Sequence, residues 1–453
     1  MTARTFAAVD IGASGGRVME GTIDGGRVEL TTVHRFPNGP IAADGHLRWD
    51  FEELVRQVAV GLAHVDAESL GIDTWAVDYG LLDADGGLLA APISYRDGRT
   101  AAVVDAVHQL IPRAELYRSN GLQFMPFNTI YQLAAERQGH LWSRAYHIVL
   151  IPDLLAHRLT GELRTEATNA STTGLLDPYT HQWSAPILEH LGFPARMLPE
   201  IERPGSVRGR TQDGTVVTTV ASHDTASAVA AVPAVTEHFA YIASGTWSLV
   251  GLEIDRPVLS FAARSANFTN ELGVDGRIRF LRNVGGLWLL QECMRSWGRE
   301  DLERLLAAAA DTPRGAIIDV DDPSFIAPDG MPDRIAAAAG RELTEAETVR
   351  CILDSLAEAY ARTIDDATNL TGTRVEVVHV VGGGSQNALL CQLTADVTGR
   401  PVIAGPVEAT ALGNILVQAR AHGAAPTSLE DLRSVVANSF ELKRYTPSKA
   451  AIA

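Results

Sequence analysis

A strand–turn–strand layout occurs twice in this sequence, once at the N-terminus and once past the middle. The first copy is AAVDIGASGGRVMEGTID, residues 7–24, and the second is AYIASGTWSLVGLEID, residues 240–255. In each copy a small apolar strand leads into a Gly/Ser/Thr turn, and the second strand ends at an aspartate. Internal duplication of this kind predicts two similar lobes facing each other across a cleft. We place the boundary near residues 233–238, with an N-terminal lobe of residues 1–235 and a C-terminal lobe of residues 236–453.

Each half also shows a local α/β pattern. Alternating apolar residues predict three meandering strands, and helical spacing behind Asp50 predicts a helix; the expected strands are 5–11, 17–23 and 28–36, the helix is 50–65, and an extended segment follows at 70–82. Residues 375–405 read as a strand, a triple-glycine turn, a helix and another strand. The predicted fold class is therefore α/β, with two ribonuclease-H-like lobes. Residues 307–341, rich in Ala, Asp and Pro, look like a peripheral insertion.

Composition excludes several function classes. The 453 residues carry 55 acidic against 38 basic side chains, a formal charge of −17, which argues against a nucleic-acid partner or an anionic membrane surface. Lysine occurs only at Lys443 and Lys449, so neither a Walker loop nor the strand lysine of a protein kinase is available. No apolar run approaches membrane length, the N-terminus lacks the layout of a signal peptide, and three scattered cysteines make no disulfide framework. We predict a cytoplasmic protein.

Three glycine-rich turns are candidate phosphate sites. Asp10 ends a strand just before the turn 12–17, and an aspartate beside exposed backbone N–H groups suits Mg²⁺ and terminal phosphates. Ser244-Gly245-Thr246 is the equivalent turn of the second copy. Gly382-Gly383-Gly384 precedes a helix and offers bare backbone to a nucleotide. Each turn also has a purely structural interpretation, as a Gly-rich hairpin or a crowded strand-to-helix connection.

A His-Asp pair, His223 and Asp224, interrupts the apolar run VASHDTASAV. A buried carboxylate without a partner costs several kcal/mol, so a folded chain keeps one there with a partner or a task. Phosphoryl transfer to a sugar hydroxyl needs a carboxylate that accepts the hydroxyl proton, and Asp224 fits that task. A helix N-cap or a structural His-Asp pair is the alternative. The tryptophans beside these turns, such as Trp75, fit either a ligand wall or the core.

The combined motifs resemble the FGGY carbohydrate kinases of the actin-like ATPase superfamily. The similarity covers most of both lobes in order, through VDIGASGGRVME, GIDTWAVDYGLLD, GLQFMPFNTIYQL, VASHDTASAV, ASGTWSLVG, RNVGGLWLLQE and VVGGGSQNALLCQLTAD. Within the family the chain is most similar to the members that act on L-rhamnulose. The resemblance implies ATP-dependent phosphorylation of L-rhamnulose to L-rhamnulose 1-phosphate, with ATP and Mg²⁺ as cofactors and a small ketose as the other partner. It leaves open whether the protein is a monomer or a homodimer.

The resemblance also implies roles for single residues. Asp224 would be the proton acceptor and Asp10 the aspartate associated with the metal. The implied substrate contacts are Ala76, His223, Asp224, Thr225 and Asn283. The implied nucleotide contacts are Ala13, Ser14, Gly15, Gly16, Arg17, Thr246, Gln291, Gly383 and Gly384.

Ala76 departs from the family pattern, which usually has a glycine that touches substrate after the tryptophan of this motif. The extra methyl group leaves the phosphoryl-transfer residues intact but alters the sugar pocket. Two alternatives therefore stay open: a kinase for another ketose, such as L-fuculose or D-xylulose, and a non-catalytic regulator that binds sugar on the same fold.

Overall fold

The structure is a computed structural model that describes residues 3–448. The chain forms two compact units. The first comprises Met1–Ala231, Glu253–Phe280 and Ala409–Ser439, and the second comprises Val232–Leu252, Leu281–Glu408 and Phe440–Ala453. The first segment of the first unit ends at Ala231, four residues before the expected boundary at 235/236. The chain then returns to the first unit twice, at Glu253–Phe280 and at Ala409–Ser439. Two late segments therefore pack with the N-terminal part, which a single boundary does not describe.

A six-stranded sheet forms the centre of the first unit, in the order β13-β14-β6-β1-β2-β3. The expected meander is present as β1 (Arg4–Gly12), β2 (Gly15–Asp24) and β3 (Arg27–Pro37), paired antiparallel. Strand β6 (Ser69–Thr74) runs parallel to β1, and β14 (Val216–Thr218) runs parallel to β6. Helix α1 (Phe51–Leu62) starts as expected at Asp50, whose side chain accepts a hydrogen bond from Glu53 N.

Smaller elements complete the first unit. Its other strands are β4 (Pro40–Ala43), β5 (His46–Trp49), β7 (Tyr79–Leu82), β8 (His147–Leu150), β9 (Thr165–Glu166), β10 (Leu176–Asp177), β11 (Gln182–Trp183), β12 (Ile201–Glu202), β13 (Val207–Arg210) and β17 (Thr269–Leu272). Its other helices are α2 (Val104–Leu110), α3 (Arg113–Asn120), α4 (Thr129–Glu136), α5 (Ile151–Thr160), α6 (Ala167–Ala170), α7 (Ala185–Leu191), α8 (Asp224–Ala230), α9 (Phe261–Ser265), α15 (Ala409–Ala421) and α16 (Leu429–Ser439).

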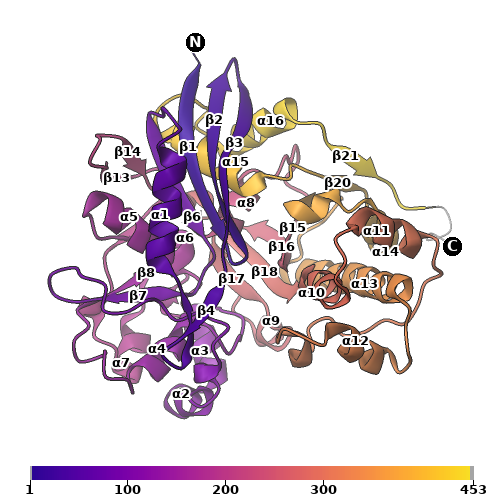
Figure 1. Cartoon of the computed structure of the whole chain (residues 1–453), viewed down its shortest axis with the longest axis horizontal. Coiled ribbons are helices and arrows are strands. Elements are labelled where there is room, and N and C mark those ends of the chain that lie inside the picture. Colours follow the sequence, from indigo (N-terminus) through magenta and orange to yellow (C-terminus); the bar gives the residue numbers. More distant parts are fainter. Residues whose placement is uncertain (1–2, 449–453) are drawn as a thin grey trace. The chain divides into compact units, whose positions relative to one another are not determined.

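Helix α15, from the C-terminal part of the sequence, packs against β1, β6 and α8, and α16 packs against β3. Figure 1 shows these two yellow helices beside the indigo strands. Glycine allows the close approach, because a Cβ atom at Gly413 would lie 1.8 Å from the backbone oxygen of Ser227 in α8. The buried face of α15 is partly polar: Gln418 donates to Ala7 O at 2.9 Å and accepts from Ser69 Oγ at 2.6 Å.

The second unit contains the other large sheet, whose strands here follow the order β18-β16-β15-β19-β20-β21. Strands β15 (Phe239–Ser244) and β16 (Trp247–Ile254) form the second copy of the strand–turn–strand layout. The predicted strand, glycine turn, helix and strand are β19 (Val377–Val381), a 3₁₀ turn at Gly383–Gln386, α14 (Ala388–Thr398) and β20 (Val402–Ala404). The remaining elements are β18 (Ile278–Gly285), β21 (Lys443–Tyr445), α10 (Trp288–Trp297), α11 (Leu302–Ala310), α12 (Met331–Ala339) and α13 (Glu345–Thr371).

The expected peripheral insertion at 307–341 is in part a core element. Val320, Phe325 and Met331 are buried, and α12 packs against α10 and α13. Asp321 accepts a hydrogen bond from Gly285 N at 2.8 Å, so the segment also supports the end of β18. The Ala, Asp and Pro content hid this packing, because the large apolar side chains that are buried lie widely and irregularly spaced along the segment. Across residues 3–448, no helix is both long enough and apolar enough to span a membrane.

A buried carboxylate holds two tryptophans in the first unit. Asp78 accepts hydrogen bonds from Trp49 Nε1 at 2.6 Å, Trp75 Nε1 at 3.0 Å, Tyr95 N at 3.1 Å and Gln132 Nε2 at 2.9 Å. The ring centroids of Trp49 and Trp75 lie 4.2 Å apart. Both tryptophans are therefore core residues with fixed ring orientations. Burial raises the pKa of Asp78 to about 6, although these hydrogen bonds act to lower it.

The close packing of α15 predicts that Gly413→Ala destabilises the first unit. The added methyl group would overlap the backbone of Ser227, and overpacking of this kind costs about 1–3 kcal/mol. Thermal unfolding measures the loss. Gly98→Ala is the matched control, because a Cβ atom there meets nothing within 4 Å. Equal melting temperatures for the two variants would contradict the proposed fit.

The raised pKa of Asp78 predicts a pH-dependent contribution to stability. Between the ordinary value of 3.8 and the folded value of about 6, the folded state binds a proton that the unfolded state has released. Stability from this group is therefore fully present below pH 4 and is lost as pH rises through 6, by about 3 kcal/mol in total. Asp78→Asn should remove that loss.

Urea denaturation of wild type and Asp78→Asn at several pH values between 4 and 7 tests this prediction. The difference between their free energies of unfolding should shift by about 3 kcal/mol in favour of the variant as pH rises. Asp66→Asn, at an exposed position, serves as control. Parallel pH curves for wild type and Asp78→Asn would show that Asp78 ionises normally.

Candidate active site

Three parallel segments of the first unit end at the same edge of its sheet. Asp10 on β1 pairs in register with Asp73 on β6. Beside β6, Thr74 forms a parallel bridge with His223, and Thr74 N donates to Ser222 O at 2.9 Å. Because the carboxyl ends of parallel strands meet at one edge, Asp10, Asp73 and Asp224 are brought into one electrostatic cluster.

Asp10 is held by the arginine of the adjoining turn. Arg17 donates to Asp10 Oδ2 from Nη2 at 2.7 Å and from Nε at 2.9 Å. The turn itself is formed by Ala13 and Ser14, between the paired ends of β1 and β2. Gly16 must be a glycine, because a Cβ atom there would lie 2.3 Å from the ring of Phe36. The predicted phosphate turn and the predicted metal-associated aspartate thus lie together.

Asp73 is a buried member of the cluster for which the sequence predicted no role. Its Oδ2 accepts a hydrogen bond from Asn414 Nδ2 of α15 at 2.6 Å. Burial holds its pKa well above the usual range, and the nearby charges of Asp10 and Asp224 act in the same direction. Asp73 lies within the motif GIDTW, but its partner Asn414 lies on a helix far along the sequence, so no local pattern pointed to the pair.

Asp224 is the first residue of α8, and His223 is the N-cap, so the carboxylate does not cap the helix. Its Oδ1 accepts hydrogen bonds from Thr225 N at 2.6 Å and from Thr225 Oγ1 at 3.1 Å. Among the described residues no donor to Oδ2 is present, and the side chain is 27% exposed. One oxygen is therefore fixed by the protein, and the other is accessible to a ligand.

His223 lies between Asp224 and a buried ion pair. Its Nε2 lies 3.5 Å from Asp224 Oδ1, and its Nδ1 lies 3.0 Å from Arg279 Nη2 and 3.4 Å from Glu271 Oε2. Arg279 donates to Glu271 at 3.1 Å, and both side chains are buried. Burial alone would raise the pKa of Glu271, but His223 and the charge of Arg279 outweigh it, so the pKa lies below its ordinary value.

A second buried carboxylate, Glu166, fixes the loop that carries the His-Asp pair. Its Oε2 accepts hydrogen bonds from Ser222 N at 3.0 Å and Ser222 Oγ at 2.8 Å. The same carboxylate accepts from Thr168 Oγ1 at 2.6 Å, and His223 N donates to that hydroxyl oxygen at 3.3 Å. Glu166 also caps α6 through the backbone N–H groups of Thr168 and Asn169. The sequence analysis did not identify this residue.

Ala76, the departure from the family pattern, lies in a strained turn. Asp78 N donates to Ala76 O at 2.9 Å, which closes a three-residue turn around Val77. Val77 has φ +67°, a conformation that a β-branched residue rarely adopts. Hydrogen bonds from Thr129 Oγ1 at 2.6 Å and Gln132 Nε2 at 3.3 Å to Val77 O hold it in place. Ala76 itself is half-buried.

In the second unit the two predicted nucleotide turns lie against each other. A Cβ atom at Gly384 would lie 2.0 Å from Ser244 Oγ, so only glycine fits there. Gly382 has φ +83° and also faces Ser244. Gly383 is exposed, and a Cβ atom there would meet nothing within 4 Å. Gly383 therefore presents bare backbone to solvent, as a site for a nucleotide requires.

The segment that contains the other predicted contacts of this unit packs on the same turn. Leu287 N donates to Gly245 O at 3.0 Å, and a Cβ atom at Gly286 would lie 2.4 Å from Thr246 O. Asn283 lies on β18 just before this contact, and Gln291 lies exposed in the first turn of α10. Thr246, Asn283, Gln291, Gly383 and Gly384 thus belong to the second unit. Ala13–Arg17, Asp10, Ala76 and His223–Thr225 belong to the first.

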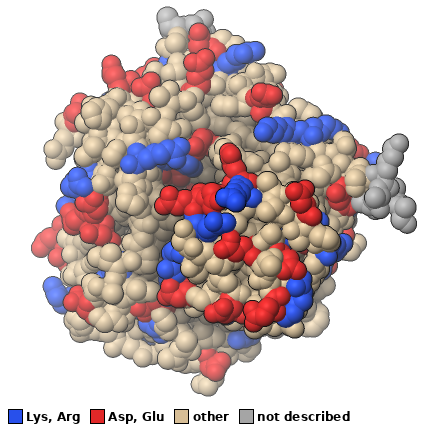
Figure 2. Space-filling view, turned by 45° about the vertical axis from the view of Figure 1, so that its right-hand side comes forward, with Lys and Arg blue, Asp and Glu red and all other residues tan. Residues whose placement is uncertain are grey.

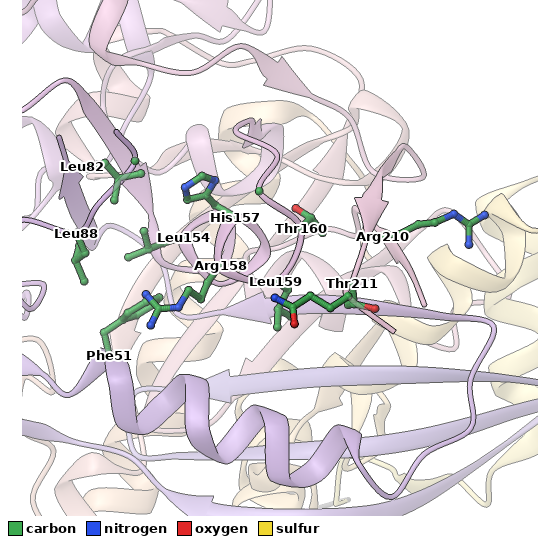
Figure 3. Close-up of a pocket in the computed structure, with 13 residues that line it drawn as sticks. Phe51, Leu82, Leu88, Leu154, His157, Arg158, Leu159, Thr160, Arg210 and Thr211 are labelled. Atoms are coloured by element: carbon green, nitrogen blue, oxygen red, sulfur yellow. The ribbon is translucent and has the colours of Figure 1, made fainter. Parts of the chain in front are cut away.

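A separate cavity of about 390 Å³ lies in the first unit, away from all the predicted site residues. Figure 3 shows His157 beside Leu82 and Leu154, and Arg158 reaching toward Phe51. Arg158 is paired with Glu52 at 2.8 Å. On the face in Figure 2, the basic side chains of the described chain lie among acidic and neutral ones and form no broad basic patch. No cluster of three or more His, Cys, Asp or Glu side chains placed to bind a metal occurs within residues 3–448.

Comparisons with known proteins match both halves of the chain to one family. The N-terminal domain model of the FGGY family of carbohydrate kinases matches residues 8–229, and the C-terminal domain model matches residues 240–422. A rhamnulokinase from Pectobacterium carotovorum subsp. carotovorum (strain PC1) is 43% identical, covering 99% of this chain and 94% of the relative. A rhamnulokinase from Klebsiella pneumoniae (strain 342) is 44% identical, covering 99% and 96%.

Solved structures share the fold at low sequence identity. Gluconate kinase from Lactobacillus acidophilus superposes with a TM-score of 0.81 at 18% identity, covering 99% of this chain and 95% of that one. Glycerol kinase from Plasmodium falciparum with ADP gives 0.78 at 17% identity, covering 99% and 95%. The predicted α/β fold class is confirmed. With both family models matched in order over most of its length, this chain belongs to the FGGY family of carbohydrate kinases.

Proposed function

We propose that this protein transfers the γ-phosphoryl group of ATP to the primary hydroxyl of L-rhamnulose, giving L-rhamnulose 1-phosphate and ADP. The observation that carries the proposal is Asp224, a carboxylate with one oxygen fixed by Thr225 and the other accessible, at a strand edge shared with Asp10. The choice of sugar rests on the near full-length likeness to two rhamnulokinases.

Asp224 is the proposed general base. As the sugar oxygen bonds to phosphorus and the bond between the β- and γ-phosphates breaks, the hydroxyl proton passes to Asp224 Oδ2. Oδ1 stays bound to Thr225, so the carboxylate keeps its orientation during the transfer. A base placed in this way typically contributes about 10²–10⁴-fold to the rate. Proton uptake also removes one negative charge from the cluster with Asp10 and Asp73.

The turns supply the proposed phosphate contacts. Backbone N–H groups of 12–16, with Arg17, would stabilise charge on the transferred group, and Thr246 with Gly383 and Gly384 would hold ATP. Asp10 offers a carboxylate, the kind of ligand that Mg²⁺ accepts alongside nucleotide phosphates, so the residues present fit the ion. Mg²⁺, when bound, neutralises phosphate charge.

The sugar contacts are proposed for both units. In the first unit His223 and Thr225 adjoin Asp224 in the sequence. Ala76 comes two residues after Thr74, which forms a bridge with His223, and Trp75, fixed by Asp78, lies next to Ala76. In the second unit the proposed contact is Asn283. A cytoplasmic location, where ATP is available, remains our prediction.

Two other functions remain as candidates for testing. Ala76 places a methyl group at a position where the family pattern has glycine, which favours examining L-fuculose and D-xylulose as substrates. A sugar-binding regulator without catalysis is the second candidate. The accessible oxygen of Asp224 weighs against it, because a pure binder needs no proton acceptor beside a phosphate turn.

The proposed base predicts that Asp224→Asn lowers turnover at least about 100-fold, because the amide cannot accept the proton. The assay is release of ADP from ATP and Mg²⁺, with L-rhamnulose, L-fuculose, D-xylulose, D-ribulose and glycerol supplied separately. Wild type should prefer L-rhamnulose. L-Rhamnulose should still raise the melting temperature of the variant, since binding stabilises the fold.

Asp66→Asn, an exposed substitution on the same unit, should keep wild-type turnover. Turnover above a tenth of wild type in Asp224→Asn would remove this residue as the base. Preference for another ketose would move the substrate assignment, and sugar binding without ADP release would favour the regulator.

The methyl group of Ala76 predicts an effect on sugar choice. Ala76→Gly should change the ratio of kcat/KM between L-rhamnulose and L-fuculose by about 10- to 200-fold, since one carbon group in a pocket is worth roughly 1–3 kcal/mol. The change should appear in KM, with kcat for L-rhamnulose nearly constant. Identical ratios in both proteins would show that residue 76 does not contact the sugar.

A further inference from the structure

Both ring nitrogens of His223 face groups of the protein. Nδ1 lies 3.0 Å from Arg279 Nη2, and Nε2 lies 3.5 Å from Asp224 Oδ1. The ring is almost fully buried, with its side chain 7% exposed. Both nitrogens of His223 are therefore directed at protein groups, so its main interactions are with Arg279 and Asp224. The family resemblance implied instead that His223 contacts the sugar.

The contact with Arg279 determines which nitrogen of His223 carries the proton. A guanidinium only donates hydrogen bonds and stays protonated in proteins. Nδ1 must therefore accept, which leaves the hydrogen on Nε2, directed at Asp224. A doubly protonated ring would bring two donors face to face at 3.0 Å. The 3.0 Å contact with Arg279 therefore favours the neutral Nε2–H form, and Glu271 Oε2, 3.4 Å from Nδ1, is the acceptor that a hydrogen on Nδ1 would face instead.

Glu271 offsets the cost of burying the charge of Arg279 inside the protein. Arg279 is completely buried, and Glu271 at 3.1 Å compensates its charge. Nη2 carries two hydrogens, so it donates one to Glu271 Oε2 and one to His223 Nδ1. Arg279 Nε donates to Leu272 O at 3.0 Å, which fixes the guanidinium plane.

We infer that Arg279 is a positioning residue that fixes the Nε2–H tautomer of His223, and that His223 in turn holds Asp224 Oδ1 so that Oδ2 faces the substrate hydroxyl. This inference rests on the proposed role of Asp224 as base. His223 Nε2 faces Oδ1 at 3.5 Å, on the oxygen that already accepts hydrogen bonds from Thr225 N and Thr225 Oγ1. Its main contribution is to turnover rather than to sugar affinity.

A matched pair of substitutions tests the role of Nε2. The amide nitrogen of glutamine can take the place of Nε2, whereas the amide of asparagine reaches only the place of Nδ1. His223→Asn should lower kcat about 10- to 100-fold, as expected when a reacting group is misplaced, with little change in the KM for L-rhamnulose. His223→Gln should recover most of the lost kcat. Both variants keep Arg279 and Glu271 themselves, and both replace the ring that Arg279 contacts, so that contact changes in the two variants alike.

The kinetic results have two contrary outcomes. A large rise in KM with kcat unchanged in both variants would show that His223 is a sugar contact alone. Equal losses of kcat in the two variants would show that a donor at the Nε2 position is not what matters. Either result overturns the inference.

The tautomer itself is measured by NMR of protein labelled with ¹⁵N-histidine. The His223 signal is identified by its absence from His223→Gln. We expect a neutral ring with hydrogen on Nε2 in wild type, and a changed proton distribution in the double variant Arg279→Met, Glu271→Gln, which removes both charges together. A protonated Nδ1 in wild type would overturn the inference even if the double variant fails to fold.

This measurement does not depend on catalysis, so failures of the two proposals can be told apart. If wild type phosphorylates no ketose, or if Asp224→Asn stays active, the proposed function fails while the tautomer is still observed. If Asp224→Asn is inactive and the ring carries its proton on Nδ1, the proposed function stands and the role of Arg279 falls.

Discussion

Parallel pairing at the centre of the first sheet is the constraint on which the candidate site depends. β1, β6 and the segment ending at His223 run side by side, so the residues at their carboxyl ends meet without any long side chain spanning a gap. The register between β1 and β6 decides which side chains meet at this edge, because it places Asp10 opposite Asp73. A shift of one residue would turn each carboxylate to the other face of the sheet.

Gathering charges at one edge has an energetic cost, which neighbouring residues offset. Asp10 is paired with Arg17, Glu271 with Arg279, and Asp73 with the amide of Asn414. Polar partners also explain how a His-Asp pair can lie within an apolar run. His223 is tolerated there because Arg279, on another element, contacts its ring, and Asp224 is tolerated because Thr225 binds one oxygen while the side chain stays partly exposed.

Sequence patterns predicted those features of the fold that depend on residues close together in the sequence. Alternation and helical spacing located β1 to β3, α1 and the glycine turns, and the steric needs at Gly16 and Gly384 explain why those turns are recognisable. Asp10 and Asp224 stood out because charge is unusual beside small apolar residues. Their functional roles, like those of the nucleotide and sugar contacts, stay predictions.

The partners of these residues could not be predicted in the same way. Glu166, Arg279 and Asn414 lie in ordinary strand or helix sequence, and nothing in a local pattern says which distant element a polar side chain will meet. The return of α15 to the first unit was missed for the same reason. Helical periodicity shows that a face is buried but does not name the surface that covers it.

Because α15 and α16 belong to the first unit, this unit cannot finish folding until late in synthesis. The first unit is not complete until Ala409–Ala421 and Leu429–Ser439 have been synthesised, although most of its sheet has emerged by Ala231. At typical rates of about 5–20 residues per second, the ribosome needs roughly 10–40 s to cover the interval. During that time the sheet surface that α15 will cover, including the buried polar groups of Ser69 and Asp73, lacks its permanent partner. A chain arrested before α15 therefore carries the strands of the candidate site without the helix that packs against them.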